Sequence, residues 1–164
     1  VATSPLARCR DVGRCLRRFG FRHVVEEGLV ELDFGDWDGR RWDEIGLSEV
    51  GAWADDLAGH APGGGETVRA LLARVASVCA QPPAALLVTH GGWLSAATWW
   101  LCGGPQAPSA AEWPRAPGYG GRVRLTRAAG QPRADGTVGE RRAVDGNDPR
   151  TPCAGTGRPA ESSR

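Results

Sequence analysis

The chain alternates short apolar runs with apolar stripes that recur at helical spacing. Continuous apolar runs predict two strands, at residues 1–3 and 86–89. Apolar side chains spaced three or four residues apart predict four helices, at residues 5–19, 48–57, 68–79 and 93–101. Strands that alternate with helices in this way are typical of an α/β fold.

The C-terminal part of the chain has a different pattern. Alternation at residues 121–125 predicts one last strand. From Ala128 to Arg164 there is no aromatic residue, leucine or isoleucine. Such a segment buries too little apolar surface to offset the entropy lost on ordering. We therefore expect one domain over residues 1–126 and a disordered Gly/Pro/Arg-rich tail over residues 127–164.

Composition narrows the class of protein. A chain of 164 residues with 41% hydrophobic content supports one core, and a net charge of +1 argues against binding to nucleic acid or an anionic membrane. No apolar run is long enough to span a bilayer, and no signal-peptide pattern opens the chain. Five cysteines without Cys-x-x-Cys spacing favour reduced thiols. A cytoplasmic protein without membrane or nucleic-acid partners is expected.

His90 stands where the second apolar run ends. Gly91 and Gly92 follow it and open the next predicted helix. Ligands of open α/β sheets bind at the carboxyl ends of strands, and a helix N-terminus favours an anion. Glycines also let backbone N–H groups approach a ligand closely. The alternative is a core histidine in an ordinary strand-to-helix turn.

Arg8 follows the first predicted strand in a similar way. Ser4 is a good N-cap residue, Pro5 suits the first helical position, and Gly20 is suited to closing the helix. Arg8 then falls in the first turn, where its planar fork can hold a phosphate through two hydrogen bonds. The alternative is a surface arginine.

Glu31 is an acidic residue in an apolar stretch. Partial burial among its neighbours would keep it protonated, as a general acid requires. The nearby Asp33, Asp36 and Asp38 fit no calcium-binding spacing and predict a solvated acidic turn.

A glycine-rich loop at residues 63–65 comes before Glu66 and Thr67. No strand immediately precedes it and Gly-x-Gly-x-x-Gly is absent, which argues against a nucleotide site. A flexible loop at the edge of a pocket is the better interpretation. Glu66 and Thr67 either approach a substrate or only begin the next helix.

Four motifs, at residues 4–8, 31–39, 64–67 and 88–92, resemble those of the histidine phosphatase (phosphoglycerate mutase-like) superfamily in the same order. Residues 42–45, Trp53 and residues 62–67 look most like the α-ribazole phosphatase branch, which acts in cobalamin synthesis. The resemblance implies a three-layer α/β sandwich, with a mostly parallel sheet and helices on both faces.

The resemblance also implies a reaction, namely hydrolysis of a phosphomonoester through a phosphohistidine intermediate without cofactor or metal. Matched by motif, Arg8 is a phosphate clamp, Glu31 the proton donor and His90 the second histidine of the site. Gly91 offers a backbone N–H, and Glu66 lies near the substrate. A small-molecule phosphate ester such as α-ribazole 5′-phosphate is the expected substrate.

The chain departs from the family at the nucleophile, which belongs to an Arg-His-Gly tripeptide on the first strand. No such tripeptide occurs, since the one Arg-His pair, Arg22-His23, is followed by Val24. We therefore expect an incomplete domain whose first strand lies upstream. The alternatives are a non-catalytic remnant that binds phosphate or a partner and, less favoured, a phosphoglycerate mutase-like enzyme.

Overall fold

The computed structural model describes residues 1–102 and 107–126. The predicted tail, residues 127–164, lies outside the described residues. Within them, β1 (Ala2–Thr3) forms the centre of a parallel sheet with the order β2-β1-β3. β2 (Val24–Val25) and β3 (Leu87–Val88) flank it, and Ala2 is in register with both Val24 and Leu87.

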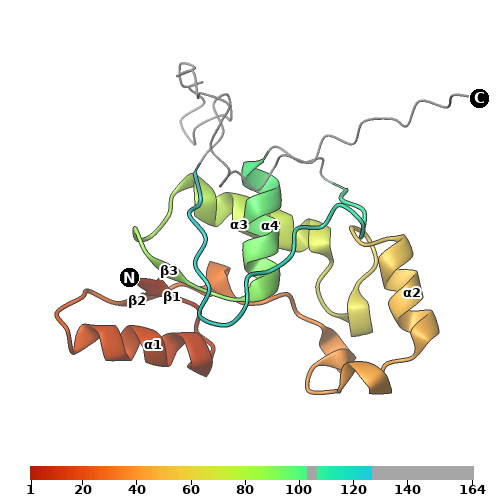
Figure 1. Cartoon of the computed structure of the whole chain (residues 1–164), viewed down its shortest axis with the longest axis horizontal. Helices are drawn as coiled ribbons and strands as arrows, with labels where there is room; N and C mark the ends of the chain where they lie inside the picture. The colour runs from red at the N-terminus through yellow and green to blue at the C-terminus, as the bar shows by residue number, and fades with distance from the viewer. Residues whose placement is uncertain (103–106, 127–164) are drawn as a thin grey trace, which may run out of the picture.

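Helices cover both faces of this sheet (Figure 1). α1 (Ala7–Arg17) packs on one face against β1 and β3. α3 (Val68–Ala80) and α4 (Gly91–Leu101) pack against each other on the opposite face. The expected architecture, helices on both faces of a parallel sheet, is confirmed.

The core lies between the sheet and the α3–α4 pair. The predicted apolar face of α3 is buried at Val68, Leu71, Leu72, Val75 and Val78. Thr67 is the N-cap of α3, and its side chain accepts a hydrogen bond from the Ala70 N–H at 3.1 Å. Sequence and structure therefore agree on both the beginning and the buried face of this helix.

The N-terminus of α1 differs from the prediction. Leu6 rather than Ser4 is the N-cap residue, and Ser4 is fully buried three residues before the helix begins. The apolar stripe that the spacing predicts for this helix, Cys9, Val12, Leu16 and Phe19, is also incomplete, because Val12 is 43% and Phe19 73% exposed. Cys9 of the stripe is buried as predicted, and so is Gly13, which is not part of the stripe.

The described part of the chain between β2 and α3 contains four short 3-10 turns. They are η1 (Glu27–Leu29), η2 (Gly35–Trp37), η3 (Trp42–Glu44) and η4 (Pro62–Gly64). Together with α2 (Leu47–Asp55), the last three form what we call the α2 lobe, residues 33–65.

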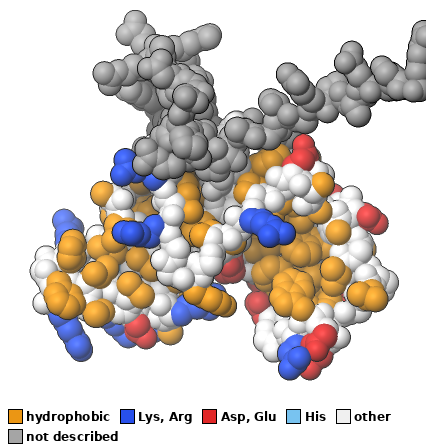
Figure 2. Space-filling model, viewed as in Figure 1, with side chains coloured by type: hydrophobic (Ala, Val, Ile, Leu, Met, Phe, Trp, Pro, Cys, Tyr) orange, Lys and Arg blue, Asp and Glu red, His pale blue; other side chains and the backbone are white. Residues whose placement is uncertain are grey.

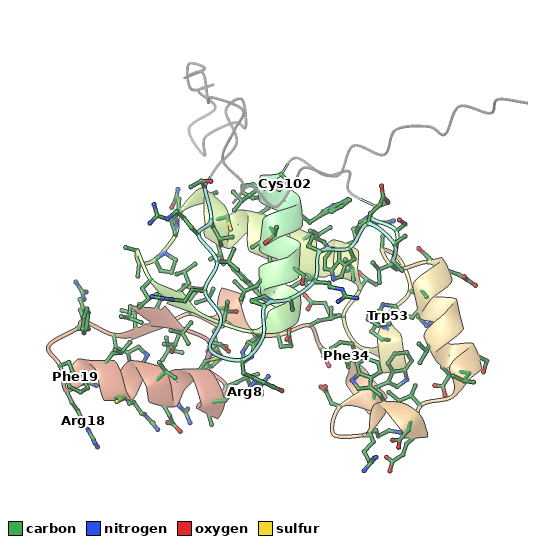
Figure 3. The ribbon with its side chains drawn as sticks, in the orientation of Figure 1. Arg8, Arg18, Phe19, Phe34, Trp53 and Cys102 are labelled. Carbon is green, nitrogen blue, oxygen red and sulfur yellow. The ribbon has the colours of Figure 1, made fainter. Side chains whose placement is uncertain are left out.

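Four aromatic rings form a cluster inside the α2 lobe. Phe34 and Trp37 each lie edge-to-face on Trp42 and on Trp53, with ring centroids 5.7–6.4 Å apart. Figure 3 shows Phe34 and Trp53 lying together in this lobe. In the space-filling view, hydrophobic side chains gather on the lobe's visible face (Figure 2).

Two further expectations are wrong. Residues 121–125 form no strand, although Leu125 packs against the core. Cys9, Cys15 and Cys79 are in no disulfide, whereas Cys102 is disulfide-bonded, so reduced cysteines are not found throughout. Across residues 1–102 and 107–126, no helix is long and apolar enough to cross a membrane.

Candidate functional site

Parallel pairing brings together two side chains that follow neighbouring strands. The Ser4 N–H donates to the Val88 carbonyl at 3.0 Å, which extends the β1–β3 ladder to the ends of both strands. Ser4 and His90 therefore emerge at the same edge of the sheet. The Ser4 Oγ and the His90 Nε2 are 2.8 Å apart. This contact explains why the Ser4 hydroxyl is not used to cap α1.

Arg8 reaches the other nitrogen of the same ring. Its Nε–H donates to the His90 Nδ1 at 3.1 Å. Because Nδ1 accepts, the ring proton of neutral His90 is on Nε2, which donates to Ser4. Burial and then the positive charge of Arg8 lower the pKa of His90, while Glu31 opposes them. The arrangement therefore holds a neutral imidazole in one tautomer.

The Arg8 guanidinium keeps free donors. Its terminal nitrogens make no hydrogen bond to any part of the chain that the structure describes, and the residue is exposed. Figure 3 shows Arg8 at the N-terminal end of α1, at the opposite end from Arg18. A planar fork in this position can hold two oxygens of a tetrahedral anion.

Cys9 packs against the same imidazole. Its Sγ lies 3.6 Å from the His90 Nε2 and donates to the Thr89 carbonyl at 3.5 Å. Burial raises the pKa of the Cys9 thiol. The thiol is thus held in its neutral form and acts as a packing group behind His90. The sequence had suggested only that Cys9 faces the core.

Glu31 lies at the N-terminus of α4, the helix that begins after His90. Its Oε2 accepts from the Gly92 N–H, and its Oε1 from the Trp93 N–H, both at 3.1 Å. Oε1 also accepts from the Leu32 N–H at 3.0 Å. The carboxylate thereby satisfies two otherwise unpaired N–H groups of the helix. Donation of a proton from Glu31 would require it to bind one and release part of this set.

Glycine is needed beside this carboxylate. A Cβ at Gly92 would lie 2.6 Å from the Glu31 Oε1. The close approach of helix and carboxylate therefore depends on Gly92. Gly91, the first residue of α4, lies between His90 and these donors.

Glu66 is placed differently from the other predicted residues. Both of its carboxylate oxygens accept from Arg74, at 2.7 and 3.2 Å. Sequence reasoning missed Arg74. The available signal was its spacing, because Arg74 lies three residues after Leu71 and four before Val78, on the buried side of α3.

The described residues contain no group of three or more His, Cys, Asp or Glu side chains placed to hold a metal ion. An arginine fork, a neutral imidazole and a carboxylate therefore lie together at the carboxyl edge of a parallel sheet, where open α/β sheets bind their ligands. The comparison with known families is more specific. The chain belongs to the histidine phosphatase superfamily (branch 1), which matches residues 1–135.

Solved structures agree with this membership. A mycobacterial glucosyl-3-phosphoglycerate phosphatase in complex with inorganic phosphate is 33% identical, with a TM-score of 0.53 over 65% of this chain and 60% of that chain. The α-ribazole phosphatase of Shigella flexneri is 27% identical, with a TM-score of 0.55 over 64% of this chain and 57% of that one. The chain thus covers less than two thirds of either relative. Among curated proteins, none matches it significantly.

Proposed function

We propose that this chain carries the phosphate-binding and proton-donating part of a phosphomonoester hydrolase that acts through phosphohistidine. One observation carries the proposal. Arg8, from the start of α1, is hydrogen-bonded to His90, at the end of β3, beside the α4 N-terminus that Glu31 occupies. Phosphoryl transfer depends mostly on positioning and on positive charge around the transferred oxygens.

Each residue has a role in the proposal. Arg8 clamps the phosphoryl oxygens with its terminal nitrogens, the Gly91 N–H holds a further oxygen, and Glu31 protonates the leaving alcohol. His90 would hold an oxygen as well by turning its Nε2–H from Ser4 to the substrate. Glu66 remains a proposed substrate-binding residue. It would contact substrate only by giving up part of its pairing with Arg74.

His90 is not the proposed nucleophile. Its Nδ1 lone pair is occupied by the Arg8 Nε–H, and its Nε2 carries a proton that faces Ser4. A nucleophilic imidazole needs a free lone pair directed at phosphorus. The proposal therefore assigns the phosphohistidine to a different histidine.

The favoured substrate is α-ribazole 5′-phosphate. Its support is the similarity of residues 42–45, Trp53 and residues 62–67 to the α-ribazole phosphatase branch, together with the Shigella relative. The mycobacterial relative makes glucosyl-3-phosphoglycerate the natural comparison substrate. A cytoplasmic location and the lack of nucleic-acid and membrane partners stay predictions.

A non-catalytic phosphate- or partner-binding remnant is the second candidate. The absence of an Arg-His-Gly tripeptide from the 164 residues favours it. A phosphoglycerate mutase-like activity is a lesser alternative. Assays for phosphate release and for phosphoglycerate isomerisation separate these three functions.

Binding of inorganic phosphate to residues 1–164 tests the site itself. We expect binding by calorimetry, and an Arg8→Ala variant that is weakened about ten- to hundredfold because two charge-assisted hydrogen bonds are lost. Arg18→Ala removes the same charge from the far end of α1 and is the control. Equal affinities for wild type and Arg8→Ala would contradict the proposal.

Turnover separates the enzyme from the remnant. The proposal predicts phosphate release from α-ribazole 5′-phosphate, without added metal, by the protein in its full natural length. Release should be faster than from glucosyl-3-phosphoglycerate. Phosphate binding by that protein without release from either ester would support the remnant instead. Robust turnover by residues 1–164 that is lost only in His90→Ala would make His90 the nucleophile.

A further inference from the structure

The Arg74 guanidinium makes five hydrogen bonds. Two join it to the Glu66 carboxylate, at 2.7 and 3.2 Å. The other three reach main-chain carbonyls, those of Gly28 at 3.0 Å, Val30 at 2.8 Å and Glu31 at 3.3 Å. Only about a fifth of each charged side chain is exposed, 21% for Arg74 and 19% for Glu66. The pair is therefore largely withdrawn from water.

The three carbonyls belong to residues 28–31, which run from η1 into an irregular stretch. Residues 30–34 lie in neither a helix nor a strand, so their main-chain groups lack a regular partner. Other elements also hold this segment, since Thr89 donates to the Leu29 carbonyl and Trp93 to the Gly28 carbonyl. Among the described side chains, Arg74 alone donates to the carbonyls of Val30 and Glu31.

The Glu31 backbone and side chain are held from two different helices. Arg74 of α3 binds the carbonyl, and the first turn of α4 binds the carboxylate. A planar guanidinium can donate to the Glu66 carboxylate and to these carbonyls in one fixed orientation, whereas a lysine ammonium cannot. The direction in which Glu31 leaves the backbone thus depends on the Arg74 fork.

We propose that the Arg74–Glu66 pair is a positioning device that aims the Glu31 carboxyl at the N-terminus of α4. The inference rests on the proposed function only in calling Glu31 the proton donor. Glu66 acts here through Arg74, by fixing the guanidinium plane. The same cation is close enough to contribute to the lowered pKa of His90, which places it in the electrostatic surroundings of the site.

Hydrogen exchange at the Gly92 and Trp93 amides reports the position of Glu31, because its carboxylate is their acceptor. We expect Arg74→Lys, which keeps the charge, and Glu66→Gln, which keeps the shape, each to accelerate exchange at both amides. The increase should be at least about fivefold, the effect of losing one hydrogen bond. Arg69→Lys, at an exposed position on the same helix, is the matched control and should change neither amide.

A purely structural role for Arg74 predicts a different result. It would lower the melting temperature and leave the two amides no faster than their neighbours in α4. That outcome in folded Arg74→Lys and Glu66→Gln variants would overturn the proposal. In a Glu31→Ala background, where both amides have already lost their acceptor, Arg74→Lys should add nothing. A further acceleration there would also contradict it.

The exchange experiment is independent of phosphate binding. If residues 1–164 fail to bind inorganic phosphate but the amides respond as expected, the proposed function fails and the positioning of Glu31 stands. If phosphate binds and the amides do not respond, the positioning of Glu31 by Arg74 fails and the proposed phosphate site stands.

Discussion

At the residue scale, the protonation of His90 links the site to the stability of the fold. The ring is 6% exposed, accepts from Arg8 at Nδ1 and faces Ser4 through Nε2. A second proton on the ring would remove the Arg8 hydrogen bond and place two cations side by side. Burial and Arg8 accordingly lower the pKa of His90.

The lowered pKa of His90 predicts acid sensitivity. In the unfolded chain this histidine takes up a proton near its ordinary pKa of about 6.5, whereas in the folded chain it does so only at lower pH. Its contribution to stability is therefore complete above about pH 6.5 and is lost as the pH falls through the folded-state pKa. The free energy of unfolding of wild type and of His90→Gln can be measured in urea between about pH 7.5 and pH 5. The difference between the two should become smaller as the pH falls. A difference that is constant over this range would contradict it.

Ser4 offers a second test at the same scale. Ser4→Ala leaves the His90 Nε2–H without its acceptor in a buried position. We expect a loss of about 1–3 kcal/mol in the free energy of unfolding, the usual cost of an unpaired buried donor. Ser77→Ala, at an exposed position on α3, is the control and should be nearly neutral by urea denaturation. Equal losses of unfolding free energy in Ser4→Ala and Ser77→Ala would mean that the contact between Ser4 and His90 does not stabilise the fold.

At the scale of elements, α1 is fitted to β2 through a glycine. The His23 imidazole lies against Gly13 and is hydrogen-bonded to the Thr3 hydroxyl at 2.8 Å. A Cβ at Gly13 would come within 2.3 Å of the ring. His23 is therefore a structural residue that joins helix, central strand and edge strand.

Gly13→Ala tests this fit. Alanine gains about 1 kcal/mol over glycine in helix propensity, but forcing the ring aside costs about 1–3 kcal/mol. We expect a net loss of stability by chemical denaturation. Gly51→Ala in α2 is the control, since a Cβ there meets nothing within 4 Å and the change should stabilise. A stabilised Gly13→Ala would show that His23 moves away at little cost.

Local sequence patterns were sufficient to predict some helices and their ends, but not others. α3 could be predicted because its cap, Thr67, and its buried face lie within one continuous stretch. The start of α1 could not, because Ser4 is a good cap residue whose hydroxyl contacts His90 instead. That competing partner is 86 residues away and comes near only through the pairing of β1 with β3.

In the candidate site, too, some contacts could be predicted from the sequence and others could not. Arg8 and His90 follow apolar strands, so their convergence could be inferred from the expectation of a parallel sheet. The pairing of Glu66 with Arg74, and of Arg74 with carbonyls 43 to 46 residues earlier, depends on how α3 packs beside η1. Main-chain acceptors have no signature in a sequence, which is why Arg74 was missed.

At the scale of the whole molecule, the α2 lobe shares a core with the body, by which we mean the sheet with α1, α3 and α4. Leu57 is part of the core cluster, and Phe34 and Trp53 pack against it. Within the lobe, Gly35 and Gly63, both with positive φ, bring η2 and η4 together so closely that neither tolerates a Cβ. Where the chain leaves the lobe, the Glu66 N–H donates to the carbonyl of Asp33, the first residue of the lobe, at 2.8 Å. The lobe and the Glu31 segment are therefore expected to unfold together.

Gly63→Ala tests this coupling, with Gly64→Ala as its control. Both positions have positive φ, +57° and +75°, and so carry a similar strain of about 1–2 kcal/mol for alanine. A Cβ at Gly64 meets nothing within 4 Å, whereas at Gly63 it would lie 2.2 Å from the Phe34 carbonyl oxygen. We expect Gly63→Ala to be the more destabilised variant, with tryptophan fluorescence and helical circular dichroism lost in one coincident transition. Three of the seven tryptophans, Trp37, Trp42 and Trp53, lie in the lobe, and the other four lie outside it. A partial change in fluorescence that precedes the main loss of helical circular dichroism would therefore mean that the lobe detaches alone. In that case the body would have to hold Glu31 without the lobe, through Arg74 and the first turn of α4.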